Sequence, residues 1–113
     1  MIKILIRKNP DKLALHLVAY GHAGTAPSGQ DTVCAAVSAL IYGFGAEVAN
    51  IGQDGLQSRI VDIGDTPGKA VIEVNCINER MYKRLLYNLA PVERGLKILA
   101  QNNPEAVSLE IRS

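Results

Sequence analysis

The chain has 113 residues, the size of one domain and enough to bury a self-standing hydrophobic core. Apolar residues make up 48% of the chain and charged residues 20%, a balance that excludes an intrinsically disordered chain. The formal net charge is +1 and there is no block of Lys or Arg, so charge alone predicts neither nucleic acid nor an acidic membrane surface as the partner.

The cysteine content and the N-terminal residues indicate in which cellular compartment the protein works. Two cysteines, Cys34 and Cys76, are too few for a disulfide framework. The opening stretch MIKILIRKNP lacks the longer apolar segment and the small-residue cleavage site of a secretory signal. No run of apolar residues approaches the length needed to span a bilayer. These features predict a reducing, cytoplasmic setting in which both thiols are free.

The first half of the chain reads as a hairpin followed by a loop and a helix. Residues 2–7 alternate apolar and charged side chains, and residues 13–20 form a second apolar stretch after the turn signal Asn9-Pro10-Asp11. We expect the two stretches to pair as antiparallel strands. Residues 21–30 are rich in Gly, Pro and Ser and read as a mobile loop. From about residue 31 to residue 50 the apolar spacing becomes helical.

The second half reads as another hairpin, followed by a helix and a last strand. Residues 57–63 and 69–76 read as two strands joined by a turn at residues 64–68. Residues 79–101 have helical spacing, and Pro91 inside that stretch is expected to kink the helix or split it in two. Residues 106–111 alternate again as a last strand. The order β-β-α-β-β-α-β predicts one α+β domain over residues 1–113, a sandwich with a mostly antiparallel sheet packed against helices.

The first predicted helix carries Cys34 between two kinds of surface. Asp31, Ser38 and Tyr42 lie on a polar strip, and Cys34 shares a face with Asp31 and Ser38. A cysteine beside an apolar stripe most often serves packing, but unsatisfied N–H groups and the dipole near a helix start favour a thiolate. The apolar stripe itself consists of Val33, Val37, Leu40, Ile41, Phe44 and Val48.

Histidine is the residue type that could activate such a thiol. His22 lies just after the second predicted strand, twelve positions before Cys34, and is either a catalytic base or a solvated or capping residue. We read His16 as a surface strand residue and Cys76 as core. Cys34, His22 and Asp31 could supply three metal ligands, but no paired spacing typical of zinc supports this reading. The glycines match no phosphate-binding loop.

The residues around Cys34 resemble a known family. The run Gly21-His22-Ala23-Gly24, then Gly29-x-Asp31, then Val33-Cys34-Ala35-Ala36-Val37-Ser38 is similar to the motif of the ribosomal-processing cysteine protease family, Prp. Chain length, element order and the late segment Gly95-Leu96…Ala100…Pro104 fit as well, so the resemblance covers essentially the whole chain.

The resemblance implies roles for individual residues. Cys34 would be the nucleophile and His22 the general base and proton donor. Asp31 and Ser38 would support them, Asp31 either by capping the helix or by orienting the imidazole. The spacing by itself leaves two caps open: Ser28, in a Ser28-x-x-Asp31 capping box, or Asp31 itself. Gly21, Gly24 and Gly29 would belong to the loop that moves to admit the peptide. Two positions depart from the family pattern: Thr25 stands where an aromatic residue is frequent, and Thr32 where Ile is frequent.

The resemblance also implies a biological task. The family removes the N-terminal extension of large-subunit ribosomal protein twenty-seven, cleaving after a Phe-containing motif. It works as a homodimer in the cytoplasm, needs no metal or organic cofactor, and contacts neither nucleic acid nor membrane directly. Two alternatives remain at this stage: a non-catalytic dimeric α+β module that binds a ribosomal component, and another thiol enzyme such as an acyltransferase.

Overall fold

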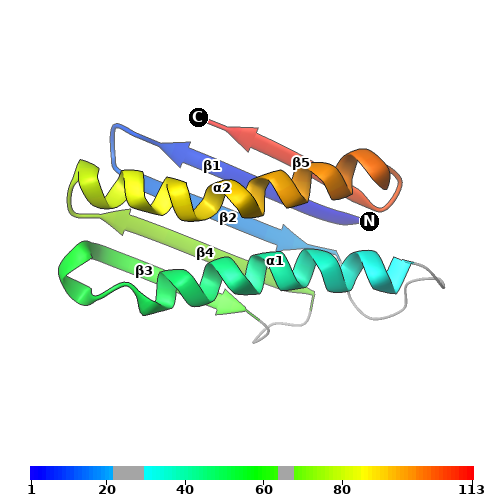
Figure 1. The fold of residues 1–113 in the computed structure, drawn as a ribbon, viewed down its shortest axis with the longest axis horizontal. Helices are drawn as coiled ribbons and strands as arrows, with labels where there is room; N and C mark the ends of the chain where they lie inside the picture. The colour runs from blue at the N-terminus through cyan, green and yellow to red at the C-terminus, as the bar shows by residue number, and fades with distance from the viewer. Residues whose placement is uncertain (22–29, 64–67) are drawn as a thin grey trace.

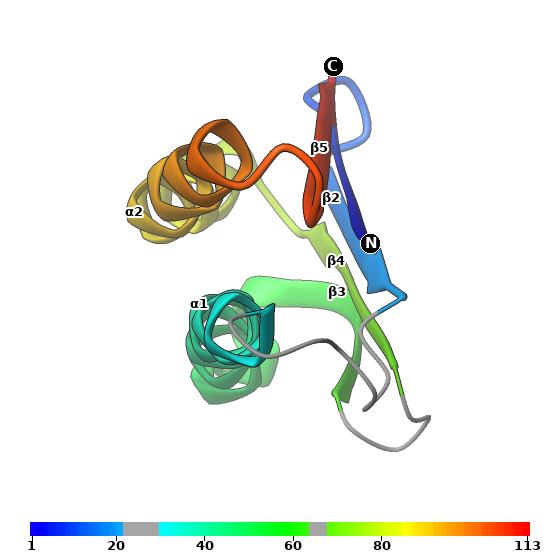
Figure 2. The ribbon, with the colours of Figure 1, turned by 90° about the vertical axis from the view of Figure 1, so that its right-hand side faces the viewer.

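Both helices lie on one face of a five-stranded sheet and leave the other face open (Figure 2). The computed structural model describes residues 1–21, 30–63 and 68–113. The elements in chain order are β1 (Ile2–Asn9), β2 (Ala14–Tyr20), α1 (Gln30–Asn50), the short 3-10 helix η1 (Gln53–Gly55), β3 (Leu56–Ile63), β4 (Lys69–Cys76), α2 (Glu79–Asn102) and β5 (Val107–Arg112). This is the predicted order of strands and helices, with bounds that shift by one or two residues.

The strands lie in the order β3-β4-β2-β1-β5 (Figure 1). Three of the four pairings are antiparallel: β1 with β2, β2 with β4, and β3 with β4. Among the strands that the structure describes, only β5 pairs in parallel, adding to the outer side of β1 after α2 has crossed the sheet. Both predicted hairpins are therefore confirmed, and the mostly antiparallel α+β fold is confirmed with them.

The alternation of buried and less buried side chains along the strands decides which face of the sheet the helices cover. In β4 every second residue from Ala70 to Cys76 is buried, and the residues between them are only half buried. The same alternation in β1 and β2 points a set of aliphatic side chains toward the helices. The most fully buried side chains join sheet and helices into one core: Phe44, Ile6, Leu15, Leu17, Ile41, Ile72, Leu85, Leu89, Leu96, Val37, Val48 and Val74.

Helix α1 has an unusually apolar composition. Its buried face holds Val37, Ile41, Phe44 and Val48 as predicted, and packs on the sheet. Thr32–Asn50 is nevertheless apolar and long enough to cross a membrane by length and composition, with a mean hydropathy of 1.6. The expectation that no stretch approaches that limit was wrong, because Ala and Gly fill positions where a surface helix usually carries charge. Only 28% of this stretch is buried.

Helix α2 is a single unbroken element despite Pro91. Pro91 was expected to kink the helix or to split it in two, and the split was wrong. Pro91 deprives the carbonyl of Tyr87 of its usual helical partner, but both residues are exposed, so water can take that partner's place. The helix begins with Asn78 as its N-cap, whose side-chain Oδ1 accepts a hydrogen bond of 2.9 Å from the Met81 N–H.

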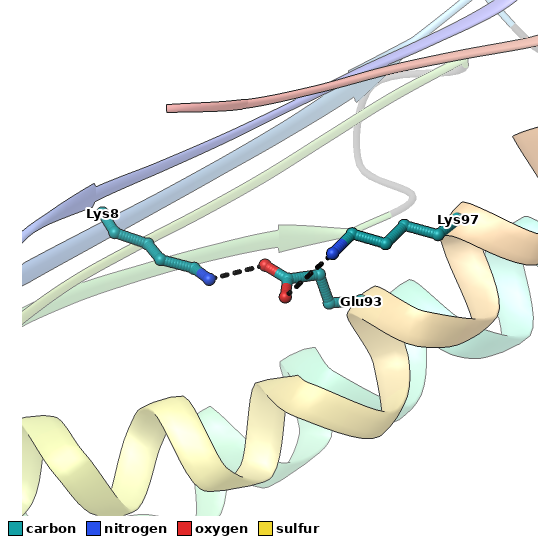
Figure 3. A network of polar contacts seen from close by, with 3 residues as sticks. All are labelled: Lys8, Glu93 and Lys97. Carbon is teal, nitrogen blue, oxygen red and sulfur yellow. Dashed lines mark ion pairs between the residues drawn. The ribbon is translucent and has the colours of Figure 1, made fainter. Parts of the chain in front are cut away.

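Polar contacts attach each helix to the sheet. The Lys8 ammonium at the end of β1 lies 2.7 Å from Oε1 of Glu93 on α2, and Lys97 approaches the other carboxylate oxygen at 3.9 Å (Figure 3). At the other helix, the Arg59 guanidinium from β3 donates to the backbone oxygens of Val48 (3.0 Å) and Ile51 (2.5 Å). That cation satisfies carbonyls at the end of α1, which has no basic residue in its own last turn.

Candidate active site

Helix α1 places Cys34 one turn from its start. The helix begins at Gln30, so Cys34 is its fifth residue. The four preceding residues carry the N–H groups that have no partner inside the helix. Helical side chains lean toward the N-terminal end, so the Cys34 side chain is directed toward the turn that carries these donors. The positive end of the helix dipole therefore lies at the end of α1 that carries Cys34.

Cys34 and Ser38 are both half buried and lie on the same side of α1. Cys34 is a free thiol that packs in part against the core. Gly45, three turns further along the same side, lies so close to Ile63 of β3 that a Cβ atom there would overlap the Ile63 side chain. Cys34 and Ser38 therefore lie on the side of α1 that contacts β3 at Gly45, but nearer the start of the helix.

The residue before His22 lies at the same end of the molecule. Gly21 directly follows β2, and Figure 1 shows the end of β2, the start of α1 and the chain's N-terminus at one end of the sheet. His22, Gly24 and Gly29 fall outside the residues that the structure describes, and so does the side chain of Asp31, whose backbone lies in the first turn of α1. The pairing of His22 with Cys34 and the supporting role of Asp31 stay predictions.

The other histidine, His16, and the other cysteine, Cys76, lie in surroundings typical of residues that serve the fold. His16 Nε2 lies 3.1 Å from Oε1 of Glu73 on the neighbouring strand β4, with both side chains 38% exposed. Because Leu15 and Leu17 point toward the helices, His16 lies on the opposite face of the sheet, as the sequence predicted. Cys76 is only 4% exposed, which confirms it as core, and burial raises the pKa of its thiol.

Gly21 has a backbone partner outside its own strand. It was expected to belong to a mobile loop, and that stays a prediction; its N–H donates a 3.0 Å hydrogen bond to the carbonyl oxygen of Gly68, and its φ angle is +102°. Sequence reasoning missed the partners Gly68 and Met1 altogether. A glycine placed directly after a strand and directly before a candidate catalytic histidine was the available signal.

Comparison with known proteins identifies the group to which this arrangement belongs. Residues 1–108 match the family described as cysteine protease Prp. The chain belongs to that family. The expected class of enzyme, a cysteine protease, is therefore confirmed at the level of the family.

Individual relatives agree with this assignment. The ribosomal processing cysteine protease Prp of Bacillus subtilis (strain 168) is 43% identical over 68 residues, a match that spans 60% of this chain and 58% of that relative. The ribosomal processing protease Prp of S. aureus, solved with a substrate peptide, has the same fold, with a TM-score of 0.72 at 18% identity over 98% of this chain and 99% of the other. The protein SMU.848 of Streptococcus mutans gives a TM-score of 0.68 at 28% identity over 100% of this chain and 96% of the other.

Proposed function

We propose that this protein is a cysteine endopeptidase that removes the N-terminal extension of large-subunit ribosomal protein twenty-seven, cleaving after a Phe-containing motif, in the cytoplasm. The observation that carries the proposal is the family match over residues 1–108, which includes the stretch with His22 and Cys34. The substrate class is supported by two structures of the S. aureus relative, one with a substrate peptide and one with a covalently linked product peptide.

In this proposal His22 and Cys34 act as a dyad. His22 takes the proton of the Cys34 thiol, and the sulfur attacks the carbonyl carbon of the residue before the scissile bond. The C–N bond breaks as His22 returns the proton to the leaving amine, and a thioester remains on Cys34. Water then attacks the thioester with His22 as the base, which releases the acid product and restores the thiol.

The start of α1 is the proposed source of stabilisation for the oxyanion. The N–H groups of residues 30–33 have no partner within the helix, and the Cys34 side chain leans toward them. A carbonyl attacked by that sulfur would develop its negative charge beside these donors. A single such donor is worth about 10²–10³-fold in rate. Ser38, one turn further along the helix, supplies a hydroxyl on the same flank and is proposed as a supporting residue.

The test uses a synthetic peptide that carries the extended N-terminus of the ribosomal protein, with products identified by mass spectrometry. We expect cleavage after the Phe by the wild type and by Cys76→Ser, and none by Cys34→Ser or His22→Ala. Cys76→Ser is the matched control, since it makes the same replacement at a thiol that the mechanism does not use. Cleavage by Cys34→Ser would overturn the mechanism. A folded wild-type protein that leaves the peptide intact would overturn the substrate.

We also propose that the protein is a homodimer joined through the exposed face of α1. Ala35, Ala39, Tyr42 and Ala46 are all exposed there, and no charged residue lies between Asp31 and Glu47. Twenty-one residues give a helix about 31 Å long, and small side chains let two helices approach to about 8 Å. A second copy packed on this face would bury no charge, and it would cover apolar surface that a soluble monomer rarely leaves in water.

Sedimentation velocity tests the dimer. We expect the wild type to sediment as a dimer and Ala39→Glu as a monomer, because one carboxylate from each copy would be buried at the contact. Gln101→Glu, an acidic substitution at an exposed position on α2, is the control and should remain dimeric. A monomeric wild type would overturn the homodimer, and a dimeric Ala39→Glu would overturn this choice of surface.

A further inference from the structure

The outer face of α2, turned away from the sheet, carries several basic residues and no acidic one. The buried residues of this helix, which face the sheet (Figure 2), are Tyr82, Leu85, Leu89 and Leu96. At about 100° per residue, the positions opposite them all hold exposed side chains. These are Arg80, Lys83, Arg84, Tyr87, Pro91, Arg94, Ile98 and Gln101, which we call the α2 basic face.

The charge of the α2 basic face is not neutralised by neighbouring carboxylates. In the part of the chain that the structure describes, none of its four basic side chains takes part in an ion pair. The two acidic residues of α2, Glu79 and Glu93, lie off this face, and Glu93 already contacts Lys8 and Lys97 (Figure 3). The net charge of +1 for the whole chain therefore conceals a positive surface along one helix.

The stability of the helix does not account for these basic residues. Arg80 lies in the first turn of α2, at the positive end of the helix dipole, where a cation is unfavourable. The last turn, where the dipole favours cations, contains no basic residue. Arg80 and Arg84 are four positions apart and both exposed, so their like charges repel each other. An arrangement that lowers helix stability in two ways indicates a surface used for binding.

An exposed aromatic ring lies in the middle of the α2 basic face. Tyr87 is 81% exposed, and Lys83 precedes it by one helical turn on the same face. Lys83 and Tyr87 line a shallow hollow of about 300 Å³ together with Leu86 and Ala90. A basic track beside an aromatic ring is typical of surfaces that bind single-stranded nucleic acid, because the cations follow the phosphates and the ring stacks on a base.

A second hollow lies next to the first, at the start of α2. It also has a volume of about 300 Å³, and Arg80 and Arg84 line it from the helix. Asp54 of η1 contributes one carboxylate to its wall against these two guanidinium groups. The hollow therefore keeps an excess of positive charge, and a guanidinium group is well suited to bind phosphate oxygens in pairs.

We propose that the α2 basic face is a docking surface for single-stranded RNA: its basic side chains contact the phosphates and Tyr87 stacks on an unpaired base. Arg80 and Arg94 are fourteen residues apart, about 21 Å along the helix, which matches about six nucleotides of a strand. The choice of RNA over DNA rests on the proposed function, since a ribosomal protein is met beside RNA. The proposal departs from the expectation, implied by the family resemblance, of no direct contact with nucleic acid.

Fluorescence anisotropy of a labelled, unstructured RNA of about 12 nucleotides, titrated at several salt concentrations, tests the proposal. We expect Arg80→Gln/Arg84→Gln to raise Kd at least about five-fold and to lower the slope of log Kd against log salt by about 1.4. Arg7→Gln/Lys12→Gln is the matched control, since it removes the same charge from two exposed positions outside α2. The control should keep the salt slope of the wild type.

Tyr87 gives a second readout that charge alone would not move. We expect Tyr87→Ala to raise Kd about five-fold or more without changing the salt slope, because stacking is lost and no phosphate contact is. Tyr87→Phe keeps a ring and should bind as the wild type does. Unchanged binding by Tyr87→Ala would make the surface a general contact for polyanions and would overturn the choice of RNA.

The remaining outcomes separate this inference from the proposed function. A wild type that cleaves the peptide but does not bind the RNA even at low salt would overturn the docking surface alone. RNA binding by a folded protein that leaves the peptide intact would overturn the peptidase alone. An equal loss of binding in Arg7→Gln/Lys12→Gln would assign binding to net charge and overturn the α2 basic face. If Arg80→Gln/Arg84→Gln does not fold, Lys83→Gln/Arg94→Gln replaces it with the same expected loss, and unchanged binding overturns the proposal.

Discussion

The start of α1 and the end of β4 each hold one cysteine, and their surroundings differ in every respect that matters for reactivity. Cys34 is half buried, lies in the second turn of α1 and shares one side of that helix with Ser38. Cys76 is 4% exposed in the core, beside Tyr82, and burial raises the pKa of its thiol. Position in the fold therefore separates the thiol that we propose as the nucleophile from one suited to packing.

The largest expected difference is in catalysis. Cys34→Ser should lower the rate of peptide cleavage by at least about 10³-fold, because the weaker nucleophile replaces the thiol in the bond-forming step. Cys76→Ser should keep kcat but lower the free energy of unfolding by about 1–3 kcal/mol, since it buries a hydroxyl in an apolar site. Cleavage assays and urea unfolding of both variants measure the two effects. Loss of activity in a folded Cys76→Ser protein would contradict the division of roles.

The next difference is in chemical accessibility. In the folded protein, iodoacetamide should modify Cys34 at least about 100-fold faster than Cys76, which becomes reachable only when the core opens; that ratio corresponds to an opening free energy of about 2.7 kcal/mol. Peptide mapping at increasing times gives both rates in one sample. In urea the two rates should converge, and a ratio near one in the folded state would show that the end of β4 opens readily.

A smaller effect concerns stability at alkaline pH. The pKa of Cys76 is higher in the folded protein than in the unfolded chain, so the folded state holds its proton more tightly. The stabilisation is fully present below the unfolded pKa of about 8.5 and is lost as pH rises through the folded pKa, with a slope of at most about 1.4 kcal/mol per pH unit. Urea unfolding between pH 7 and 10.5 should show this decline in Cys34→Ser. Cys34→Ser/Cys76→Ala should decline less steeply, and identical slopes would rule out the contribution.

The smallest expected effect is on Tyr82. Burial raises the pKa of its phenol, and the nearby Cys76 thiolate raises it further. Cys76→Ala should therefore lower the pKa of Tyr82 while leaving it above that of an exposed tyrosine. Ultraviolet absorbance of the phenolate against pH reports the shift, with Tyr82→Phe identifying the signal. An unchanged titration in Cys76→Ala would mean that burial alone accounts for the raised pKa.

Much of the fold followed from local patterns in the sequence. The alternation of apolar and polar residues predicted both ends of β4, and the 3.6-residue spacing of apolar residues predicted α1 and its buried stripe. Both patterns work because each reports which side of a strand or helix faces the core. Turn residues marked both hairpins. The same reasoning allowed a split of α2 at Pro91, which was wrong, since the sequence does not reveal that Pro91 and Tyr87 both lie on an exposed side of α2.

The sequence by itself determined the element order, the family motif and the different characters of Cys34 and Cys76. Only the tertiary structure decided the strand order, the parallel pairing of β5 with β1, and the contacts of Gly21 with Gly68 and Met1. Those features depend on contacts between segments far apart in the chain. Met1, Gly21 and Gly68 become neighbours only when β1, β2 and β4 lie side by side, and no pattern within any one segment encodes that meeting.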